Sequence, residues 1–425
     1  MSQQRPKLSG YQRRLVERER TVASTFTWLD YSEHDRRRAL DLVDQFRDRT
    51  TRDELGIGTV RDALSDALFP GISTIQTRAR YFLFVPWLYR SLEKGEASSA
   101  DIARLARKAE LDLIDRLADS DDIEGVIGIE ARRTLKRLPS NVYWQGLFEW
   151  GIRRHPAAQA AYHRFFKAFS QAARTSDREG DDEALSGGAV RPMWHSALPQ
   201  PPEDFPKTAS FALELEEARY LQERILAKAG GTMLACLIGA DSQLNLSGFP
   251  WEYEGVARLP ASVRNELDHA RRFSAVMHGA ALVYNALIAH AQQNEESMAD
   301  FRDRLLEWTD EMVALRPELE SWDVKEFWRR VRLQNNRIGR PTWAFIQTWI
   351  DMTVKGSVMV GDDISDAARR LISDRERSLK GAQSRLLNKT AMEQWNGEAG
   401  TGRLSYRWNR VLSIVRDIQE GLGHA

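Results

Sequence analysis

The chain has 425 residues, of which 42% are hydrophobic and 29% are charged, a composition typical of soluble globular proteins with two or three domains. Lysine plus arginine and aspartate plus glutamate are equal at 61 each, which excludes a uniformly basic nucleic-acid-binding protein and leaves local clusters of cations as candidate sites. The single cysteine, Cys236, excludes a disulfide within the chain and a cysteine-rich zinc or iron–sulfur site.

The expected compartment is the cytoplasm, with no role in a membrane. A chain with one cysteine fits a reducing compartment. The N-terminal arm, residues 1–24, is charged and lacks the apolar centre of a signal peptide. The longest apolar run, 81–89, is far shorter than the roughly 20 residues of a membrane-spanning helix.

Apolar residues recur with the helical period along most of the chain, and few segments alternate as strands do. The pattern therefore predicts a mainly α-helical protein. The expected helices, in chain order, span residues 36–46, 101–117, 211–228, 264–292, 301–315, 367–387 and about 405–420.

A polar, turn-rich stretch at 175–209 interrupts this pattern with five prolines and a Ser-Gly-Gly run. We interpret it as a linker or a long functional loop that joins two helical lobes. Within it, Trp194 and His195 form an apolar and titratable patch that an inert linker does not need, so they are candidates for a base or sugar pocket. The expected domains are a charged arm at 1–24, an N-terminal helical domain at 25–174 and a C-terminal helical domain at 210–425 with a basic and aromatic segment.

A glycine-rich turn at 55–58 precedes another expected helix of the N-terminal domain. Gly56 and Gly58 frame the turn, Thr59 is a candidate N-cap, and Asp62 completes a capping-box pair. Backbone amides at such a helix start can bind a phosphate. The pattern approaches the helix-hairpin-helix motif that contacts the DNA backbone, but no proline precedes the first glycine and the motif's alanine stands one place late. An ordinary capped turn explains the same residues.

Two carboxylates lie four residues apart in this helix, which places Asp62 and Asp66 on one face. Helix capping explains the presence of Asp62, whereas Asp66 lies beyond the first turn and has no capping role. Asp66 is therefore the first candidate for a catalytic carboxylate, and Asp62 is the second.

A further helix is expected to start at Ser73 or Thr74, after a Phe-Pro-Gly turn. Its first turns carry Gln76, Arg78 and Arg80, and a wholly apolar stretch follows. A buried helix with polar groups only at its N-terminal end directs those groups into a cleft, so they are candidates for the base or sugar pocket. A core helix with a solvated first turn is an equally good interpretation.

The segment 327–350 contains no acidic residue and combines basic with aromatic side chains, which is the pattern of a nucleic-acid groove. Its candidate DNA contacts are Arg329, Arg330, Arg332, Asn335, Asn336, Arg337, Arg340 and Trp343. A smaller cluster near the C-terminus, with Arg407 and Trp408, is expected to join them. The alternative is a solvated loop whose arginines pair with acids elsewhere in the fold.

Several signatures of metal-dependent and nucleotide-dependent enzymes are missing. The sequence contains no G-x-x-x-x-G-K-[ST] phosphate-binding loop, no H-E-x-x-H zinc site and no G-x-S-x-G nucleophile elbow. We therefore expect neither a metal nor another cofactor.

The block F-P-G-x-S-T-I-Q-T-R-x-R-Y-F-L-F-V-P-W, residues 69–87, resembles an uncharacterised bacterial family found in phage-defence loci. The resemblance begins at Gly56-Ile57-Gly58 and continues to Tyr406-Arg407-Trp408, so it covers most of the chain. The family in turn resembles a defence DNA glycosylase that removes α-glucosylated hydroxymethylcytosine from phage genomes. The resemblance implies an anti-phage enzyme that acts on double-stranded phage DNA and leaves abasic sites.

The chemistry of base excision can be compared with the candidate residues. A monofunctional glycosylase extrudes the nucleotide, binds the base and stabilises an oxocarbenium-like sugar while water attacks. One carboxylate suffices for this step, as in glycoside hydrolysis, and arginines supply the phosphate contacts. The roles given above rest on chemistry alone, because the resemblance carries no catalytic map.

The alternative function is a non-catalytic DNA-sensing or protein-adaptor subunit of a phage-defence system, with a protein partner from the same locus. A deep basic cleft with a carboxylate at its floor favours the enzyme. A large exposed apolar patch favours the adaptor.

Overall fold

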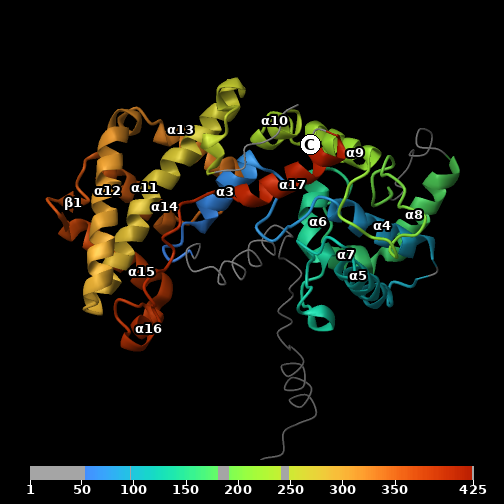
Figure 1. The fold of residues 1–425 in the computed structure, drawn as a ribbon, viewed down its shortest axis with the longest axis horizontal. Coiled ribbons are helices and arrows are strands. Elements are labelled where there is room, and N and C mark those ends of the chain that lie inside the picture. The colour runs from blue at the N-terminus through green and yellow to red at the C-terminus, as the bar shows by residue number, and fades with distance from the viewer. Residues whose placement is uncertain (1–52, 96, 180–190, 241–247, 424–425) are drawn as a thin grey trace, which may run out of the picture.

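The computed structural model describes residues 53–95, 97–179, 191–240 and 248–423 (Figure 1). Over these residues the protein is mainly α-helical, which confirms the expected fold class. The charged arm at 1–24, the helix expected at 36–46 and the Ser-Gly-Gly run lie outside the described residues.

The described helices are joined by connections of very different length, from the single residue Phe165 to loops such as 119–138. They are α3 Gly58–Leu68, α4 Tyr81–Lys94, α5 Ile102–Ala118, α6 Pro139–Glu149, α7 Gln159–Arg164, α8 Phe166–Glu179, α9 Leu215–Lys228, α10 Met233–Ile238, α11 Ala261–Ala291, α12 Glu295–Glu320, α13 Val324–Gln334, α14 Arg340–Val354, α15 Asp366–Lys380, α16 Lys389–Glu393 and α17 Trp408–Gly421. The 3-10 helices are Arg132–Thr134, Pro250–Glu252, Val256–Arg258 and Gly381–Gln383. Strands β1 Met359–Val360 and β2 Asp363–Ile364 pair antiparallel, with Met359 opposite Ile364.

Most of the expected helices are present, with shifted ends. The helices expected at 101–117 and 264–292 correspond to α5 and α11, and the one at about 405–420 corresponds to α17. Helix α12 is longer than the expected 301–315, and α15 ends before the expected residue 387. Apolar spacing therefore located these helices but not their ends.

The helix expected after the Phe-Pro-Gly turn begins later than predicted, at Tyr81. Residues 72–80 form turns instead. The hydroxyl of Tyr143 in α6 accepts hydrogen bonds from the amides of Thr77 and Arg78, at 2.9 and 3.1 Å. These amides are satisfied from a distant part of the chain, so no helical turn is needed to satisfy them.

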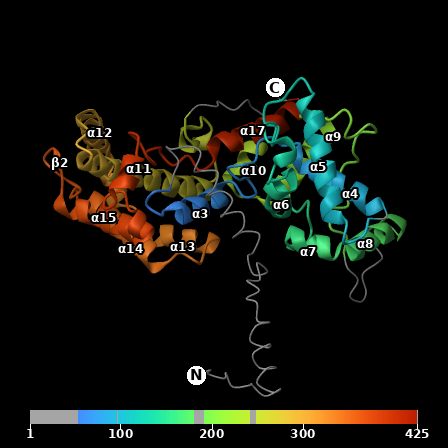
Figure 2. The same cartoon turned by 90° about the horizontal axis from the view of Figure 1, so that it is seen from below.

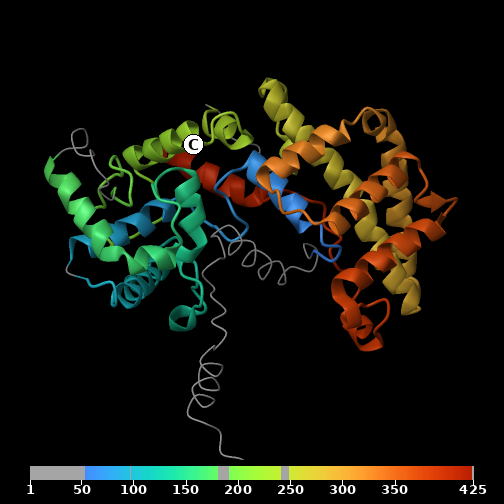
Figure 3. The same ribbon diagram turned by 180° about the vertical axis from the view of Figure 1, so that it is seen from behind.

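Two groups of helices lie at opposite ends of the long axis, α4 to α9 in one and α11 to α16 in the other (Figures 1, 2 and 3). Helices α3 and α17 lie between them. Helix α3 packs on α11 and α13, whereas α17 packs on α9 and α10. The first described helix thus packs with the second group and the last helix with the first. The division into chain-contiguous domains at 175–209 stays a prediction.

Helix α11 is the centre of the second group. At Gly279 it lets the Trp308 ring of α12 approach so closely that a Cβ there would lie 2.3 Å from the ring. The indole N–H groups of Trp308 and Trp349 each donate to an α11 carbonyl at 2.9 Å. By length and composition α11 is apolar enough to cross a membrane, and 78% of its apolar window is buried within the protein. The expected absence of a membrane role stays a prediction.

The described part of the proline-rich stretch, 191–209, packs against the first group. Trp87 of α4 donates its indole N–H to the carbonyl of Pro199 at 2.7 Å, and the ring of Phe205 stacks on Phe84 at 5.6 Å. Trp194 forms an isolated antiparallel bridge with Arg153. This stretch therefore holds Trp194 in a defined place beside α4.

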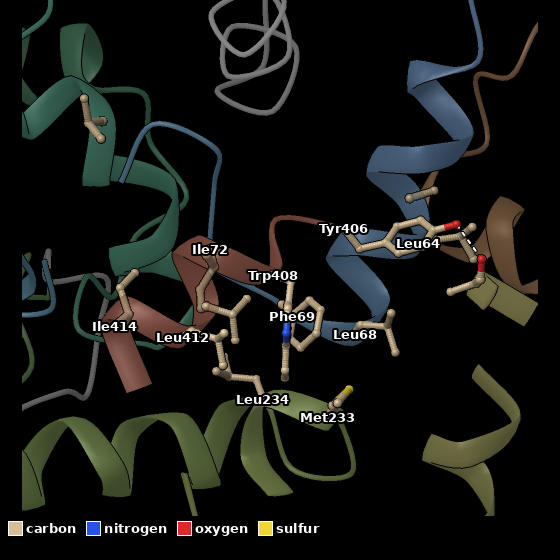
Figure 4. Packing of buried hydrophobic residues seen from close by; sticks show 14 of the residues in the cluster. Leu64, Leu68, Phe69, Ile72, Met233, Leu234, Tyr406, Trp408, Leu412 and Ile414 are labelled. Carbon is tan, nitrogen blue, oxygen red and sulfur yellow. Dashed lines mark hydrogen bonds between the residues drawn. The ribbon is translucent and has the colours of Figure 1, made fainter. Parts of the chain in front are cut away.

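Trp408 connects α17 to α3 and α10 (Figure 4). Its side chain is fully buried, and its ring lies 5.8 Å from that of Phe69 at the end of α3. Leu234 and Met233 of α10 lie below the indole in this view (Figure 4). The C-terminal motif thus contributes a large aromatic side chain to the core between the two groups.

Candidate functional site

The turn before α3 holds a carboxylate of the chain itself. Asp53 accepts hydrogen bonds from the amides of Ile57 and Gly58, at 2.8 and 2.7 Å. Thr59 is exposed and makes no cap, so the predicted capping box is wrong. The amide of Gly58, expected to bind a phosphate, already has an anionic partner, and the carbonyl of Gly56 accepts from Arg375 at 3.1 Å. Aspartate side chains commonly accept hydrogen bonds from backbone amides a few residues later in a turn. Asp53 is therefore the residue from which this turn was predictable, and it was not among the candidates.

The structure brings Asp62 and Asp66 together on one face of α3, as their spacing predicts. Both face Arg407, whose Nη1 lies 2.6 Å from Asp66 Oδ1 and whose Nη2 lies 3.6 Å from Asp62 Oδ1. Asp62 also accepts two hydrogen bonds from Arg61, at 2.9 and 3.0 Å. These pairings favour a structural role for both carboxylates. Their catalytic role stays a prediction without support from this geometry.

Arg407 and Trp408 near the C-terminus are not exposed on a surface that DNA could contact. The Arg407 side chain is 3% exposed and also donates to the carbonyl of Ile72 at 2.7 Å. Trp408 is fully buried and has no exposed ring face on which a base could stack. The expected DNA contacts of both residues are therefore not met by this structure, because the motif that contains them is part of the core.

The three polar residues expected to line a pocket are bonded within the fold. Gln76 accepts from the amide of Ser73 and donates to the carbonyl of Gly71, both at 3.0 Å. Arg78 pairs with Asp417 of α17 at 3.0 Å and with Asp122 at 2.6 Å. Arg80 is 5% exposed and pairs with Glu217 of α9 at 2.8 Å. Their polar groups are used within the fold, where Arg78 and Arg80 join the start of α4 to α17 and α9, so this geometry gives the predicted pocket no support.

Trp194 and His195 do line a cavity, of about 250 Å³, at the C-terminal end of α4. We call it the α4 cavity. Its charged lining consists of Arg90, Glu93, Lys94, Arg154 and Arg174. The Nε2 atom of His195 lies 2.7 Å from Nη1 of Arg224, and because a guanidinium only donates, the imidazole proton is on Nδ1. Apart from Trp194 and His195, the residues predicted for a pocket were those at the N-terminal end of the apolar helix. The charged residues at its C-terminal end were not among them.

A second hollow, of about 960 Å³, lies along α13 and α14, and we call it the α13–α14 groove. Its lining combines Trp322, Trp328 and Trp343 with three cations, Lys325, Arg329 and Arg332, and two carboxylates, Asp323 and Asp351. Trp343 is 38% exposed and lies 6.3 Å from the Trp328 ring, whereas Leu333 is 71% exposed. Of the predicted candidates, Arg329, Arg332 and Trp343 thus share one concave surface.

Some arginines of the segment 327–350 are already engaged in ion pairs within the protein. Arg330 pairs with Glu266 and Glu326 at 2.6 and 2.7 Å, and Arg329 pairs with Glu326 at 2.6 Å. Those hydrogen bonds lower the pKa of Glu326 to about 2, so it stays ionised beside both arginines. Arg330 therefore follows the alternative interpretation, because it pairs with an acid from elsewhere in the fold, Glu266 of α11.

The remaining candidates lie nearer the loop between α13 and α14. Arg332 and Arg340 are exposed and make no ion pair within the described part of the chain. Asn336 and Arg337 are also exposed. Asn335 is 5% exposed and accepts from the amide of Arg337 at 3.1 Å, so its expected contact with base edges is not met.

Among the described residues, no three His, Cys, Asp or Glu side chains are arranged to hold a metal ion. The chain has no detectable match among curated proteins or among solved structures. Residues 23–419, most of the chain, match a family of unknown function, DUF6361, and the chain therefore belongs to that family.

Proposed function

We propose that the protein binds phage DNA through the α13–α14 groove. The observation that carries this proposal is the concave surface that places the partly exposed ring of Trp343 beside Lys325 and the exposed Arg332. Aromatic faces stack on bases and cations contact phosphates, and the two together are typical of nucleic-acid grooves. A protein of zero net charge needs such a local concentration of cations to bind DNA.

The reaction that we propose is excision of a modified, glucosylated hydroxymethylcytosine from phage DNA by hydrolysis of its N-glycosidic bond. The support for excision is the resemblance in the block at 69–87 and its continuation to Tyr406-Arg407-Trp408. The product is an abasic site, and the reaction needs water but no cofactor.

Base release from matched phage DNAs tests this function. The purified chain is incubated with glucosylated and with unmodified DNA, abasic sites are detected by alkaline strand cleavage, and released bases are identified by mass spectrometry. We expect release from the glucosylated DNA alone. Binding of both DNAs without release or cleavage would contradict the enzyme and favour a DNA sensor.

We expect a defined loss of DNA binding when two exposed cations are reversed, Arg332 of the groove and Arg340 at the start of α14. The double variant Arg332→Glu/Arg340→Glu should weaken binding to all sequences. It should also reduce the slope of log affinity against log salt by about 1.8, because each phosphate contact contributes about 0.9. Fluorescence anisotropy at several salt concentrations measures both quantities.

The matched control reverses two exposed cations of α5, in the variant Lys108→Glu/Arg116→Glu. It changes the net charge equally and should leave the salt slope unchanged. Trp343→Ala should weaken binding by about 1–3 kcal/mol if one base stacks on the ring. Equal slopes in both double variants, or no effect of Trp343→Ala, would contradict the groove as the DNA-binding surface.

A further inference from the structure

The α4 cavity is built from four segments that are distant in the sequence, one of which contributes Arg154. Arg90, Glu93 and Lys94 come from the last turns of α4, Arg174 comes from α8, and Trp194 comes from the stretch after residue 190. The bridge between Arg153 and Trp194, together with the hydrogen bond from the amide of Arg154 to the carbonyl of Met193 at 2.8 Å, fixes that stretch beside α4. The cavity is therefore a fixed feature of the fold.

Four cations and one carboxylate line the cavity. Lys94 and Arg174 are exposed at its rim, and Arg154 donates to the hydroxyl of Ser196 at 2.8 Å. Arg174 also donates to the carbonyl of Gly95 at 2.6 Å, at the C-terminal end of α4, where a cation is favoured. The Nη1 atom of Arg90 is buried and has no hydrogen-bond partner among the described residues. A buried donor without a partner is costly, which indicates that an anionic or polar ligand completes it.

Glu93 is the only carboxylate of this lining. It is 3% exposed, and its Oε1 accepts a hydrogen bond from the Tyr162 hydroxyl at 2.5 Å. Burial raises the pKa of Tyr162 well above its usual value, so the hydroxyl remains a donor and orients the carboxylate. A buried carboxylate among cations in a cavity is the arrangement expected of a catalytic site rather than of a solvated helix end.

The size of the cavity matches a single base. A cavity of roughly 150 Å³ holds benzene, so about 250 Å³ suffices for one pyrimidine ring with substituents. The buried indole of Trp194 lines the cavity and supplies apolar contact for a ring. A bulky substituent on the base would extend toward the rim, where Lys94 and Arg174 are exposed.

We infer that the α4 cavity receives a pyrimidine base extruded from DNA, and that Glu93 is the catalytic carboxylate. This inference rests on the proposed base excision and assigns its active site. The cations contact the phosphates that flank the extruded nucleotide and stabilise the negative charge that develops on the departing base.

The reaction balances with one water molecule. The bond between the sugar C1′ and N1 of the base breaks, and its electron pair stays on the base. The water oxygen bonds to C1′ and loses one proton to Glu93. Glu93 then passes this proton to the released base, which leaves a hydroxyl on C1′ and a regenerated carboxylate.

The variant Glu93→Gln tests this assignment in the full chain. The glutamine oxygen still accepts the hydrogen bond of Tyr162 but cannot take up a proton, so we expect base release to fall by at least about 100-fold. DNA binding, measured by anisotropy, should stay unchanged. Glu216→Gln, an exposed position of α9, is the matched control and should release base at the normal rate.

A second variant fills the cavity without touching the carboxylate. Ala173 of α8 lines the cavity, and Ala173→Phe should abolish base release while DNA binding persists. Absence of release by the unsubstituted protein would contradict the proposed function itself. Release by the unsubstituted protein that persists in Glu93→Gln or in Ala173→Phe would overturn the α4 cavity as the active site.

Discussion

Replacing Arg407 with alanine is expected to lower the free energy of unfolding by roughly 3–5 kcal/mol, the usual cost of breaking a buried ion pair from one side. The Arg407 guanidinium is almost fully buried and joins Asp66 of α3 to the carbonyl of Ile72. Its loss leaves the Asp66 carboxylate, 16% exposed, without this cation. Urea denaturation followed by circular dichroism measures the change.

Arg410→Ala is the control for this experiment, because Arg410 lies three residues after Arg407, in the first turn of α17, and is exposed, with one hydrogen bond to the carbonyl of Thr74. It should cost less than about 1 kcal/mol. A similar, small effect of Arg407→Ala would contradict the structural role of the buried pair.

The variant Asp66→Asn distinguishes a structural from a catalytic role of the carboxylate that pairs with Arg407. Asparagine keeps an oxygen that accepts from Arg407 but loses the charge, so we expect a reduced free energy of unfolding and normal base release by the folded protein. Abolished release with unchanged stability would restore Asp66 as the catalytic carboxylate and count against Glu93.

The helices were predictable because their apolar spacing is a local property. Helices α5, α11 and α17 each bury one face or more. The apolar residues on a buried face recur about every 3.6 residues, so this pattern can be recognised from the sequence of a single helix. The turns at 72–80 were not predictable, because the groups that stabilise them, Tyr143 and Asp417, come from α6 and α17. Non-local hydrogen bonds of this kind leave no periodic signal in the sequence.

The candidate site was predictable only in part, for the same reason. The basic and aromatic segment is continuous in sequence, and three of its candidate residues, Arg329, Arg332 and Trp343, line one groove. The α4 cavity combines segments from 90–94, 154, 173–174 and 192–196, and only Trp194 and His195 were candidates beforehand. Helical spacing drew attention to Asp66, and the start of the apolar stretch drew attention to Arg78 and Arg80. In the structure these three side chains join segments of the fold.

Glu110 predicts a second large effect, which depends on pH. It is 1% exposed, and it accepts hydrogen bonds from the amide and the hydroxyl of Ser140, both at 2.7 Å. Burial, partly offset by these bonds, raises the pKa of Glu110 from 4.5 to about 7. The folded protein therefore holds this proton more tightly than the unfolded chain does. The stability that the proton contributes is complete below pH 4.5 and is lost as the pH rises through 7.

The variant Glu110→Gln removes this titration. The free energy of unfolding of the unsubstituted protein minus that of the variant should fall by on the order of 3 kcal/mol between pH 4.5 and 7, and then stay constant. Urea denaturation at a series of pH values measures this difference.

Three histidines, the buried His269 and the half-buried His163 and His278, act in the opposite direction. Desolvation lowers the pKa of each to about 4, so stability rises with pH up to their usual value of 6.5. They are present in both proteins, so their contribution cancels in the difference. Glu216→Gln, at an exposed position, should give a difference that does not vary with pH. A flat difference for Glu110→Gln as well would show that Glu110 is ionised in the fold, with Ser140 compensating its burial in full.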